Sequence, residues 1–389
     1  MTEVIPLSVP NFCGNEKKYV DKAIDTEWVS TAGIFIGQFE TQLSQQVGVP
    51  DACACQSGTA GLHLCLRHFG IGAGDVVLVP TLTFIATINA VMYQSAHPVF
   101  FDCDNHMCMN LEQVEWYLSR MCQVEGDRTI EIATGKPVKA IIPVHVFGDH
   151  CDMDQLMQLA ERYHLCVIED ATESLGGTFA RGAYMGRYSG TVGHAGVYSF
   201  NGNKIITTGG GGMVVSPDAE AVRHIRYLSQ QAKDDALYFV HEEYGYNYRM
   251  TNIQAALGLA QLEQLPSFLE IKRRNYVAYR ERLASCIYGK LLPFGSGDAS
   301  NHWFYSFALN GPDAGERDRL IQYMNDLKIQ VRPIWKLNHT QTPFQGFRAM
   351  NCPNAKRFYD RVINIPCSTN LTREQIDRVC DALLAFKKG

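Results

Sequence analysis

Short apolar runs alternate with longer amphipathic segments through the first 260 residues of the chain. The apolar runs are typical of buried strands and lie at residues 52–55, 76–80, 98–101, 140–147, 165–168 and on either side of residue 204. The amphipathic segments predict helices at residues 12–27, 36–48, from 57, from 81, 155–163 and 217–232. A mixed, charged segment over residues 112–137 predicts a helix and an exposed loop. Because strands that alternate with helices form parallel sheets covered on both faces, this pattern predicts an α/β fold.

The last third of the chain has a different pattern. A long helical stretch extends from about Asn252 to Ser285, and Pro266 predicts a break or a kink within it. From about residue 300 the pattern returns to strand, helix and strand, which predicts a smaller α+β domain. We therefore expect two domains, a large α/β domain at residues 1–260 and a connecting helix with the small domain at residues 261–389.

Composition limits the class of protein further. The 389 residues are 46% hydrophobic and 19% charged, which is typical of a globular chain with a sizeable core. The net charge is −5 and no basic stripe is present, so nucleic acid is not an expected partner. No apolar run reaches the roughly 18 residues of a membrane helix, and residues 1–6 lack the features of a secretory signal. Thirteen scattered cysteines without an export signal are typical of reduced, buried side chains, so we expect a cytoplasmic protein.

Residues 197–215 carry the most distinctive chemistry. A short apolar strand ends in polar residues, presents Lys204, and continues through four glycines, Gly209–Gly212, into a second apolar strand. Burying a lysine is costly unless its charge is paired or neutralised. A desolvated lysine has a lowered pKa, and its free amine can form a Schiff base with a carbonyl, as in pyridoxal phosphate enzymes. This stretch alone is equally compatible with a surface hairpin whose lysine is solvated.

The helix that follows the first predicted strand begins with small residues, two of which carry hydroxyl groups. These residues are Ser57, Gly58, Thr59 and Ala60. The N-terminus of a helix presents free N–H groups and the positive end of its dipole, so this turn is a candidate phosphate cradle. The alternative is an ordinary N-cap, which is the commoner role of Ser or Thr at such a position.

Two further residues follow predicted strands. Asp170 lies just after the strand at residues 165–168, where ligands bind in open α/β sheets, and its carboxylate could pair with a protonated ring nitrogen. Helix capping is an equally good interpretation of Asp170 taken alone. Phe84 follows the strand at residues 76–80, where an aromatic ring could stack on a flat cofactor, although an isolated aromatic residue there is more often part of the core.

Five potential metal ligands lie in one contiguous turn. They are His145, His150, Cys151, Asp152 and Asp154. They lack the paired spacing of zinc sites, so we predict no metal site. Asp152 or Asp154 more simply caps the helix predicted over residues 155–163.

The order of these motifs resembles that of the DegT-type sugar aminotransferases, which are fold-type I, pyridoxal-phosphate-dependent enzymes. The resemblance extends over nearly the whole chain and rests on seven segments: WVSTAG at 28–33, SGTAGLHL at 57–64, PTLTFIATINAV at 80–91, VHVFG at 144–148, IEDATESLGG at 168–177, SFNGNKIITTGGGG at 199–212 and GYNYRMTNIQAALGLAQLEQL at 245–265. It implies a large domain with a mostly parallel, seven-stranded type of sheet flanked by helices, and a smaller C-terminal α+β domain.

The resemblance also implies a role for each matching residue. Lys204 matches the Schiff-base lysine, Asp170 the aspartate that keeps the pyridinium nitrogen protonated, and Phe84 the aromatic residue that stacks on the ring. The implied phosphate-binding positions are Thr59, Ala60 and Ser199, and the other implied cofactor-binding positions are Ser57, Gly58 and Asn203. Asn247 matches an asparagine that reaches the phosphate from the neighbouring subunit, so the resemblance implies a homodimer with shared sites.

Two positions depart from the family pattern. Glu173 stands where many members have Gln or His in contact with the cofactor's ring oxygen, and we keep Glu173 among the cofactor-binding residues. Gly210 stands where many members have Glu after the lysine. We expect this second change to alter the local turn or substrate contacts rather than the chemistry.

The implied reaction is a ping-pong transamination between L-glutamate and a nucleotide-linked keto-sugar. Lys204, once freed from the cofactor, shuttles a proton as general base and acid. Residues 5–11, the loop at 28–33 and VRPIWKLNH at 331–339 are most similar to 4-aminotransferases that act on UDP-4-keto-6-deoxy-N-acetylhexosamines, in the bacillosamine and legionaminic acid pathways of surface glycans.

The expected substrate contacts are Trp28, Thr31, Arg332 and His339. A guanidinium binds phosphate oxygens in a bidentate manner, so Arg332 is a candidate for the diphosphate of the nucleotide. A surface salt bridge is an equally good interpretation of Arg332, and a position in the core is an equally good interpretation of His339.

The same residues bear on other functions. A GDP-4-keto-6-deoxymannose aminotransferase of the perosamine type, or a sugar 3-aminotransferase, fits the same motifs. The family's dehydratase branch has histidine at the position of Lys204, which argues against a dehydratase. A non-catalytic regulator that binds the cofactor would not need the complete set of matching residues. A nicotinamide-dependent dehydrogenase would use a glycine loop that opens a helix, whereas Gly209–Gly212 precedes a strand.

Overall fold

The computed structural model describes residues 3–235, 237–311 and 314–386. Within these ranges the larger sheet has the strand order β1 (Asp51–Cys55), β9 (Gly212–Ser216), β8 (Ala195–Ser199), β7 (Cys166–Asp170), β6 (Pro137–Ile141), β2 (Val76–Pro80) and β3 (His97–Phe101). The strands from β8 to β3 pair in parallel, whereas β9 pairs antiparallel with both of its neighbours. The mostly parallel sheet predicted from the apolar runs is therefore confirmed.

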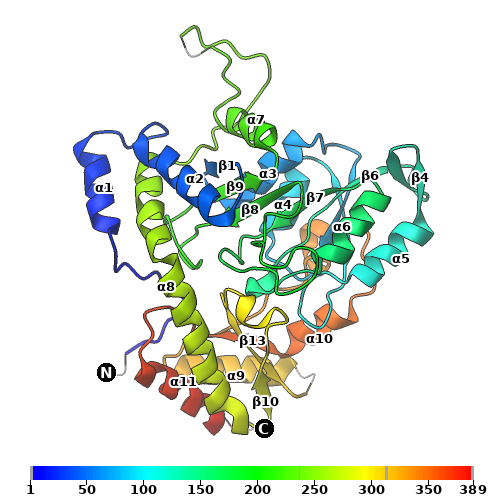
Figure 1. Cartoon of the computed structure of the whole chain (residues 1–389). Coiled ribbons are helices and arrows are strands. Elements are labelled where there is room, and N and C mark those ends of the chain that lie inside the picture. The colour runs from blue at the N-terminus through cyan, green and yellow to red at the C-terminus, as the bar shows by residue number, and fades with distance from the viewer. Residues whose placement is uncertain (1–2, 236, 312–313, 387–389) are drawn as a thin grey trace.

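Helices cover both faces of this sheet (Figure 1). One face packs against α3 (Gly58–His68), α4 (Ala86–Tyr93) and α7 (Ala219–Ser229). The other face packs against α2 (Ile34–Val47), α5 (Leu111–Met121), α6 (Met153–Arg162) and α8 (Asn252–Arg282). The strands are apolar at nearly every position because successive side chains point to opposite faces of the sheet, and each face packs into a hydrophobic core. In β2, Val77 and Val79 pack on the face covered by α3, and Val76 and Leu78 pack on the opposite face.

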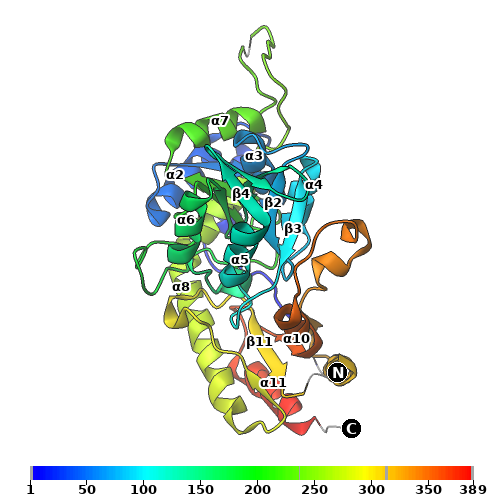
Figure 2. The same ribbon diagram turned by 90° about the vertical axis from the view of Figure 1, so that its right-hand side faces the viewer.

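A smaller antiparallel sheet lies beyond the first, with the strand order β10 (Gly289–Leu291), β11 (Tyr305–Leu309), β13 (Val362–Ile365) and β12 (Arg332–Pro333). It packs with α9 (Ala314–Asp326), α10 (Pro353–Arg361) and α11 (Arg373–Ala385). Figures 1 and 2 show this part below the large sheet, with α8 extending along both. The N-terminal segment also reaches the smaller part, because Ile5 forms a bridge with Ile329.

The structure corrects two predictions of irregular structure. α8 continues through Pro266 to Arg282, so the predicted break is wrong, and the alternative of a kink at Pro266 stays a prediction. The exposed loop expected after α5 contains a hairpin, formed by β4 (Cys122–Glu125) and β5 (Arg128–Glu131). Its chain reversal includes Gly126, which has a φ of +64°. Polar and charged side chains dominate this hairpin, so its sequence is typical of a loop.

The boundaries of other elements differ from those predicted. The first helix, α1, is shorter than expected and covers Glu16–Asp25. The helix expected from residue 81 begins at Ala86, and the hydroxyl groups of the preceding threonines bond to other side chains, as in the 2.6 Å contact of Thr81 Oγ1 with His339 Nδ1. The strand expected to reach residue 147 ends at Ile141, and Val146–Gly148 form a 3-10 turn.

Between α7 and α8, residues 230–235 and 237–247 form an arm that extends away from the body of the molecule (Figure 1). Large apolar side chains near its tip are exposed to solvent. They include Leu237, Tyr238, Phe239 and Val240. Of the helices in the described ranges, none has both the length and the apolar character that a membrane span requires.

Candidate active site

A cavity of about 240 Å³ lies at the carboxyl edge of the large sheet. Its walls come from the loops after β2, β7 and β8 and from the first turn of α3. The lining residues include Ser57, Gly58, Thr59, Thr83, Phe84, Thr87, Asp170, Thr172, Glu173, Ser199 and Lys204. Because parallel strands present their carboxyl ends at one edge, residues that are distant in the sequence gather here. The structure thus brings together most of the cofactor-binding residues that were predicted.

Lys204 follows β8 and is held in a turn in which its N–H donates to the carbonyl of Asn201 at 3.0 Å. Only 12% of its side chain is exposed, and its Nζ lies 3.8 Å from Oε1 of Glu173 and 4.0 Å from the ring centroid of Trp303. Burial lowers the pKa of Lys204, although Glu173 and Asp170 oppose this effect. The interpretation of Lys204 as a solvated surface residue is therefore wrong.

Asp170 ends β7 and is buried against the cavity. Its Oδ2 accepts a hydrogen bond from Oγ1 of Thr87 at 2.7 Å, and its Oδ1 accepts one from the N–H of Thr172 at 3.2 Å. No helix follows within residues 171–178, so helix capping does not explain Asp170. The carboxylate is fixed in direction and is available as a negative charge at the cavity wall.

Glu173 is the second carboxylate in the cavity. It lies in the turn after β7, and its Oε2 accepts a hydrogen bond from the N–H of Phe147 at 2.8 Å. Burial raises the pKa of Glu173 to about 7, although Lys204 and the N–H of Phe147 favour the charged form. Burial thus favours the neutral carboxyl of Glu173, and Lys204 favours the carboxylate.

The first turn of α3 forms another wall. Ser57 is the N-cap of the helix, and its Oγ accepts a hydrogen bond from the N–H of Ala60 at 3.1 Å. By helix geometry, the N–H groups of Gly58 and Thr59 have no partner inside the helix, and both residues line the cavity. A Cβ at Gly58 would lie 2.9 Å from Thr172 Cγ2 and 3.1 Å from Ser199 Cβ, so a larger residue would crowd this wall. The turn is both an ordinary cap and a candidate anion site.

Several predicted residues do not line the cavity. Ala60 is buried within α3, and its N–H is already used by Ser57. Asn203 directly precedes Lys204, and its carbonyl accepts hydrogen bonds from Ser8 Oγ at 3.2 Å and from Trp303 Nε1 at 2.7 Å. Asn203 thus holds the turn that carries the lysine.

The residues expected to contact the substrate also do not line the 240 Å³ cavity. Trp28 and Thr31 are in an exposed loop that is tied to the start of α8 through the carbonyl of Trp28. Arg332 is exposed on the edge strand β12. His339 is half-buried, and its Nδ1 lies 2.6 Å from Oγ1 of Thr81. Asn247 is exposed at the base of the arm.

Four residues that shape the site were not predicted from the sequence, namely Thr87, Thr172, Phe147 and Trp303. Thr87, Thr172 and Phe147 lie inside the motifs already quoted, and for Thr87 a polar residue within an otherwise apolar segment was the available signal. Trp303 lies about a hundred residues beyond Lys204 in the sequence, and no pattern connects the two.

Three of the residues considered as metal ligands, His145, Asp152 and Asp154, make polar contacts within the protein. Nε2 of His145 lies 2.8 Å from Oε2 of Glu169, and both side chains are fully buried. Asp152 caps α6, because its Oδ1 accepts a hydrogen bond from the N–H of Gln155 at 3.1 Å, as predicted. Asp154 accepts one from the N–H of Ala183 at 3.0 Å. In the part of the chain that the structure describes, no group of three or more His, Cys, Asp or Glu side chains is arranged to hold a metal ion.

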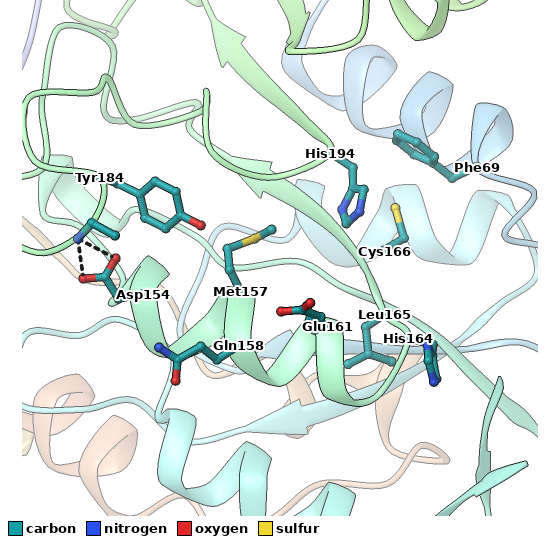
Figure 3. Close-up of a pocket in the computed structure, with 12 residues that line it drawn as sticks. Phe69, Asp154, Met157, Gln158, Glu161, His164, Leu165, Cys166, Tyr184 and His194 are labelled. Carbon is teal, nitrogen blue, oxygen red and sulfur yellow. Dashed lines mark hydrogen bonds between the residues drawn. The ribbon is translucent and has the colours of Figure 1, made fainter. Parts of the chain in front are cut away.

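A larger cavity of about 800 Å³ lies elsewhere on the large sheet (Figure 3). Its walls include Met157 and Glu161 of α6, Cys166 at the start of β7 and His194 just before β8. It therefore opens at the amino ends of these strands, away from the edge that carries Lys204. No lysine lines it, so it offers no amine nucleophile.

The residues of the 240 Å³ cavity suit pyridoxal phosphate. Lys204 offers an amine to the aldehyde, and the carboxylate of Asp170 offers a partner for the ring nitrogen. The start of α3 offers N–H groups to the phosphate. Phe84 is 54% exposed at the cavity wall, so its ring is available to cover a flat ligand.

Comparisons with known proteins agree with this assignment. The DegT/DnrJ/EryC1/StrS aminotransferase family matches residues 11–384. The GDP-perosamine synthase of Caulobacter vibrioides is 37% identical over 388 residues, with 97% of each chain covered. The GDP-perosamine synthase of Escherichia coli O157:H7 is 36% identical, with 98% of each chain covered. A crystal structure of a DegT/DnrJ/EryC1/StrS aminotransferase from Brucella abortus is similar with a TM-score of 0.84 at 28% identity, covering 95% of this chain and 94% of the other.

Proposed function

Because this chain belongs to the DegT/DnrJ/EryC1/StrS aminotransferase family, we propose that it transfers an amino group from L-glutamate to the 4-keto group of a nucleotide-linked 4-keto-6-deoxy sugar. The chain is a pyridoxal-phosphate-dependent sugar aminotransferase. The observation that carries the proposal is the enclosed amine of Lys204, which shares one cavity with the buried carboxylate of Asp170 and the start of α3.

Each of these groups has a task in transamination. When bound, pyridoxal phosphate supplies an aldehyde that condenses with amines and a ring that accepts electrons. Lys204 would hold the group covalently and, when its amine is free, would accept and return a proton at Nζ. Asp170, fixed by Thr87 and Thr172, would supply the negative charge that keeps the ring nitrogen protonated. The first turn of α3 would bind the phosphate, and Phe84 would cover the ring.

The experiment for this function is a substrate panel. Purified protein is incubated with pyridoxal phosphate, L-glutamate and each of several UDP-, GDP- and dTDP-linked keto-sugars, and the products are identified by mass spectrometry. We expect one class of 4-keto-6-deoxy sugar nucleotide to gain an amino group while 2-oxoglutarate accumulates. Failure to aminate any nucleotide sugar, with the cofactor demonstrably bound, would contradict the proposal.

The identity of the nucleotide separates two candidates. The opening segment, the loop at 28–33 and the segment at 331–339 favour a UDP-linked N-acetylhexosamine, as in surface glycan synthesis. The relatives named GDP-perosamine synthase favour a GDP-linked 4-keto-6-deoxymannose. The same panel distinguishes them, because each candidate predicts which of the two nucleotides gives the higher kcat/KM.

We propose that Arg332 and His339, with Trp28 and Thr31, contact the sugar nucleotide. Arg332 supports this role because it is exposed and carries a fixed positive charge suited to a diphosphate. Replacing Arg332 with Ala should raise KM for the sugar nucleotide at least about tenfold more than KM for glutamate, as expected for a lost charge-assisted contact. Equal changes in both KM values would argue against the contact.

We also propose a homodimer in which Asn247 reaches the cofactor site of the second copy. Tyr238, near the tip of the arm, is 75% exposed, and exposed apolar side chains in a group are typical of an interface. Asn247 lies at the base of the same arm, which is held by the hydrogen bond from the N–H of Tyr248 to the carbonyl of Ser229. Light scattering should give twice the mass of the chain. Asn247→Ala should weaken cofactor binding about tenfold, the loss expected for a hydrogen bond to a charged phosphate, whereas the exposed control Asn351→Ala should not.

A further inference from the structure

Three charged side chains meet in the 240 Å³ cavity, and they are not held equally. Both oxygens of Asp170 already accept hydrogen bonds, from Thr87 and from the N–H of Thr172. Glu173 uses only Oε2 in this way, for the N–H of Phe147. Its Oε1 lies 3.8 Å from Nζ of Lys204, and only 2% of its side chain is exposed. Glu173 is therefore the carboxylate that is placed to exchange a proton with the lysine.

The backbone around Glu173 is built to hold this arrangement. Phe147, which donates to Glu173, has a φ of +56°, a left-handed conformation that is rarely adopted by a residue with a bulky side chain. The next residue, Gly148, has a φ of +95°, and a Cβ there would clash with Oδ1 of Asn301. Asn301 in turn donates from Nδ2 to the carbonyl of Glu173 at 2.9 Å. In this turn the N–H of Phe147 donates to Oε2 of Glu173, and Oε1 of Glu173 faces Lys204.

We propose that Glu173 takes a proton from Nζ of Lys204 and returns it, so that the lysine alternates between its ammonium and its neutral amine without exchanging protons with bulk water. In this step the ammonium N–H bond breaks, a carboxyl O–H bond forms, and no electrons are transferred to another group. Burial favours the neutral forms on both sides, because it lowers the pKa of Lys204 and raises the pKa of Glu173 to about 7. Asp170 is the other charged group that acts on both residues.

The proposed function explains why this proton exchange would be useful, since a transaminase needs a free lysine amine that can gain and lose a proton. In that respect alone the inference rests on the proposed function. The exchange itself can be measured without substrate. A protein that aminates no sugar could still pass the test below, and an active aminotransferase could still fail it.

The first measurement uses cofactor-free protein. Lys204 is labelled with trace acetic anhydride across a pH series, and the labelled peptide is quantified by mass spectrometry. Glu173→Gln keeps an oxygen for the N–H of Phe147 but removes the negative charge, so the midpoint for Lys204 should shift to lower pH by about one unit or more. The matched control Glu263→Gln, an exposed carboxylate on α8, should leave the midpoint unchanged. Coincident midpoints for Glu173→Gln and the unaltered protein would overturn the proposal.

The second measurement separates proton exchange from a simple effect of charge. It is the rate at which cofactor-free protein captures pyridoxal phosphate, followed by visible absorbance at pH 7. A lower pKa alone would give Glu173→Gln more neutral amine and equal or faster capture. Loss of the proton partner instead predicts capture at least about tenfold slower, within the range for one general acid–base group. Capture at an undiminished rate would also overturn the proposal.

A second variant guards against misfolding. Glu173→Asp keeps a carboxylate but shortens its reach, so capture should fall between the unaltered protein and Glu173→Gln. Thermal unfolding of each variant is recorded in parallel. If Glu173→Gln does not fold, the rate at which Glu173→Asp captures pyridoxal phosphate tests the proposal. An unchanged rate despite the shortened side chain would contradict it.

Discussion

Lys204 and Lys272 are both enclosed by protein, but they are held in different ways. Nζ of Lys272 donates to the carbonyl oxygens of Trp303 at 2.8 Å and of Cys367 at 2.5 Å, and the side chain lies in the core beside the small sheet. Lys204 has an acidic partner at 3.8 Å and opens into a cavity. Burial lowers the pKa of both lysines. The environment of the amine, not its burial, separates a structural lysine from a reactive one.

Two neighbouring carboxylates on β7 repeat this contrast. Glu169 points to one side of the strand and accepts hydrogen bonds from the N–H groups of Gly190, Val192 and Gly193, in addition to its contact with His145. Burial would raise the pKa of Glu169, but these partners lower it. Asp170 points to the opposite side and faces the cavity. A carboxylate surrounded by fixed donors stabilises the fold, whereas one at a cavity wall is available to a ligand.

The two lysines give the largest expected difference. Lys204→Ala should reduce kcat by at least about 1,000-fold, because no other residue supplies its acid–base role. Lys272→Met should retain the visible absorbance of the bound cofactor but lower the free energy of unfolding by about 2 kcal/mol, because two buried carbonyl groups lose their partner. Steady-state kinetics and chemical denaturation of both variants check this. Comparable kinetic defects in the two variants would erase the distinction between them.

The two carboxylates give the next largest effect. Asp170→Asn should lower kcat about 100-fold with little change in stability, because an amide cannot stabilise a positive ring nitrogen. Glu169→Gln should lower the free energy of unfolding by about 3 kcal/mol, since it breaks a buried, hydrogen-bonded pair with His145. Denaturation curves and kinetics are compared for each variant. The contrast fails if Glu169→Gln is stable but inactive.

The structural cluster around His145 also predicts a pH effect. His150 packs beside it, neither ring nitrogen has a hydrogen-bond partner among the described residues, and burial lowers the pKa of His150 to about 3. The unfolded chain binds this proton below about pH 6.5, so the stability associated with neutral His150 is present above that pH and is lost as the pH falls. At pH 5 the loss is about 2 kcal/mol. Thermal unfolding should therefore depend less on pH between 7 and 5 in His150→Leu than in the unaltered protein or in the exposed control His241→Leu.

The smallest predicted effect concerns the cavity wall. Gly58→Ala should weaken pyridoxal phosphate binding about tenfold, a difference of about 1.4 kcal/mol, because its Cβ would crowd Thr172 and Ser199. Gly37→Ala is the matched control, because Gly37 lies in α2 and a Cβ there would meet no other atom within 4 Å. Equilibrium titration with the cofactor measures both. Equal affinities for the two variants would indicate that the close approach at Gly58 is unimportant.

The sequence was informative where a pattern is local. The apolar runs revealed most strands of the large sheet, and the glycine run after Lys204 marked the turn before β9. It was uninformative where the chain folds back on itself. Trp303 reaches the site from a distant segment outside every quoted motif, so periodicity could not connect it with Lys204. Phe147 lies in a quoted motif but contributes its backbone N–H, which its side-chain type does not reveal. The predicted break at Pro266 does not occur, because packing along α8 overrides a local helix breaker.

The most direct test of the central claim is covalent fixation of the cofactor. Purified protein is incubated with pyridoxal phosphate, reduced with borohydride, digested and mapped by mass spectrometry. We expect a yellow protein with one major modified residue, Lys204, and no modification of Lys272. A colourless protein, or a label fixed mainly to another lysine, would contradict the claim that this enclosed amine is the reactive centre.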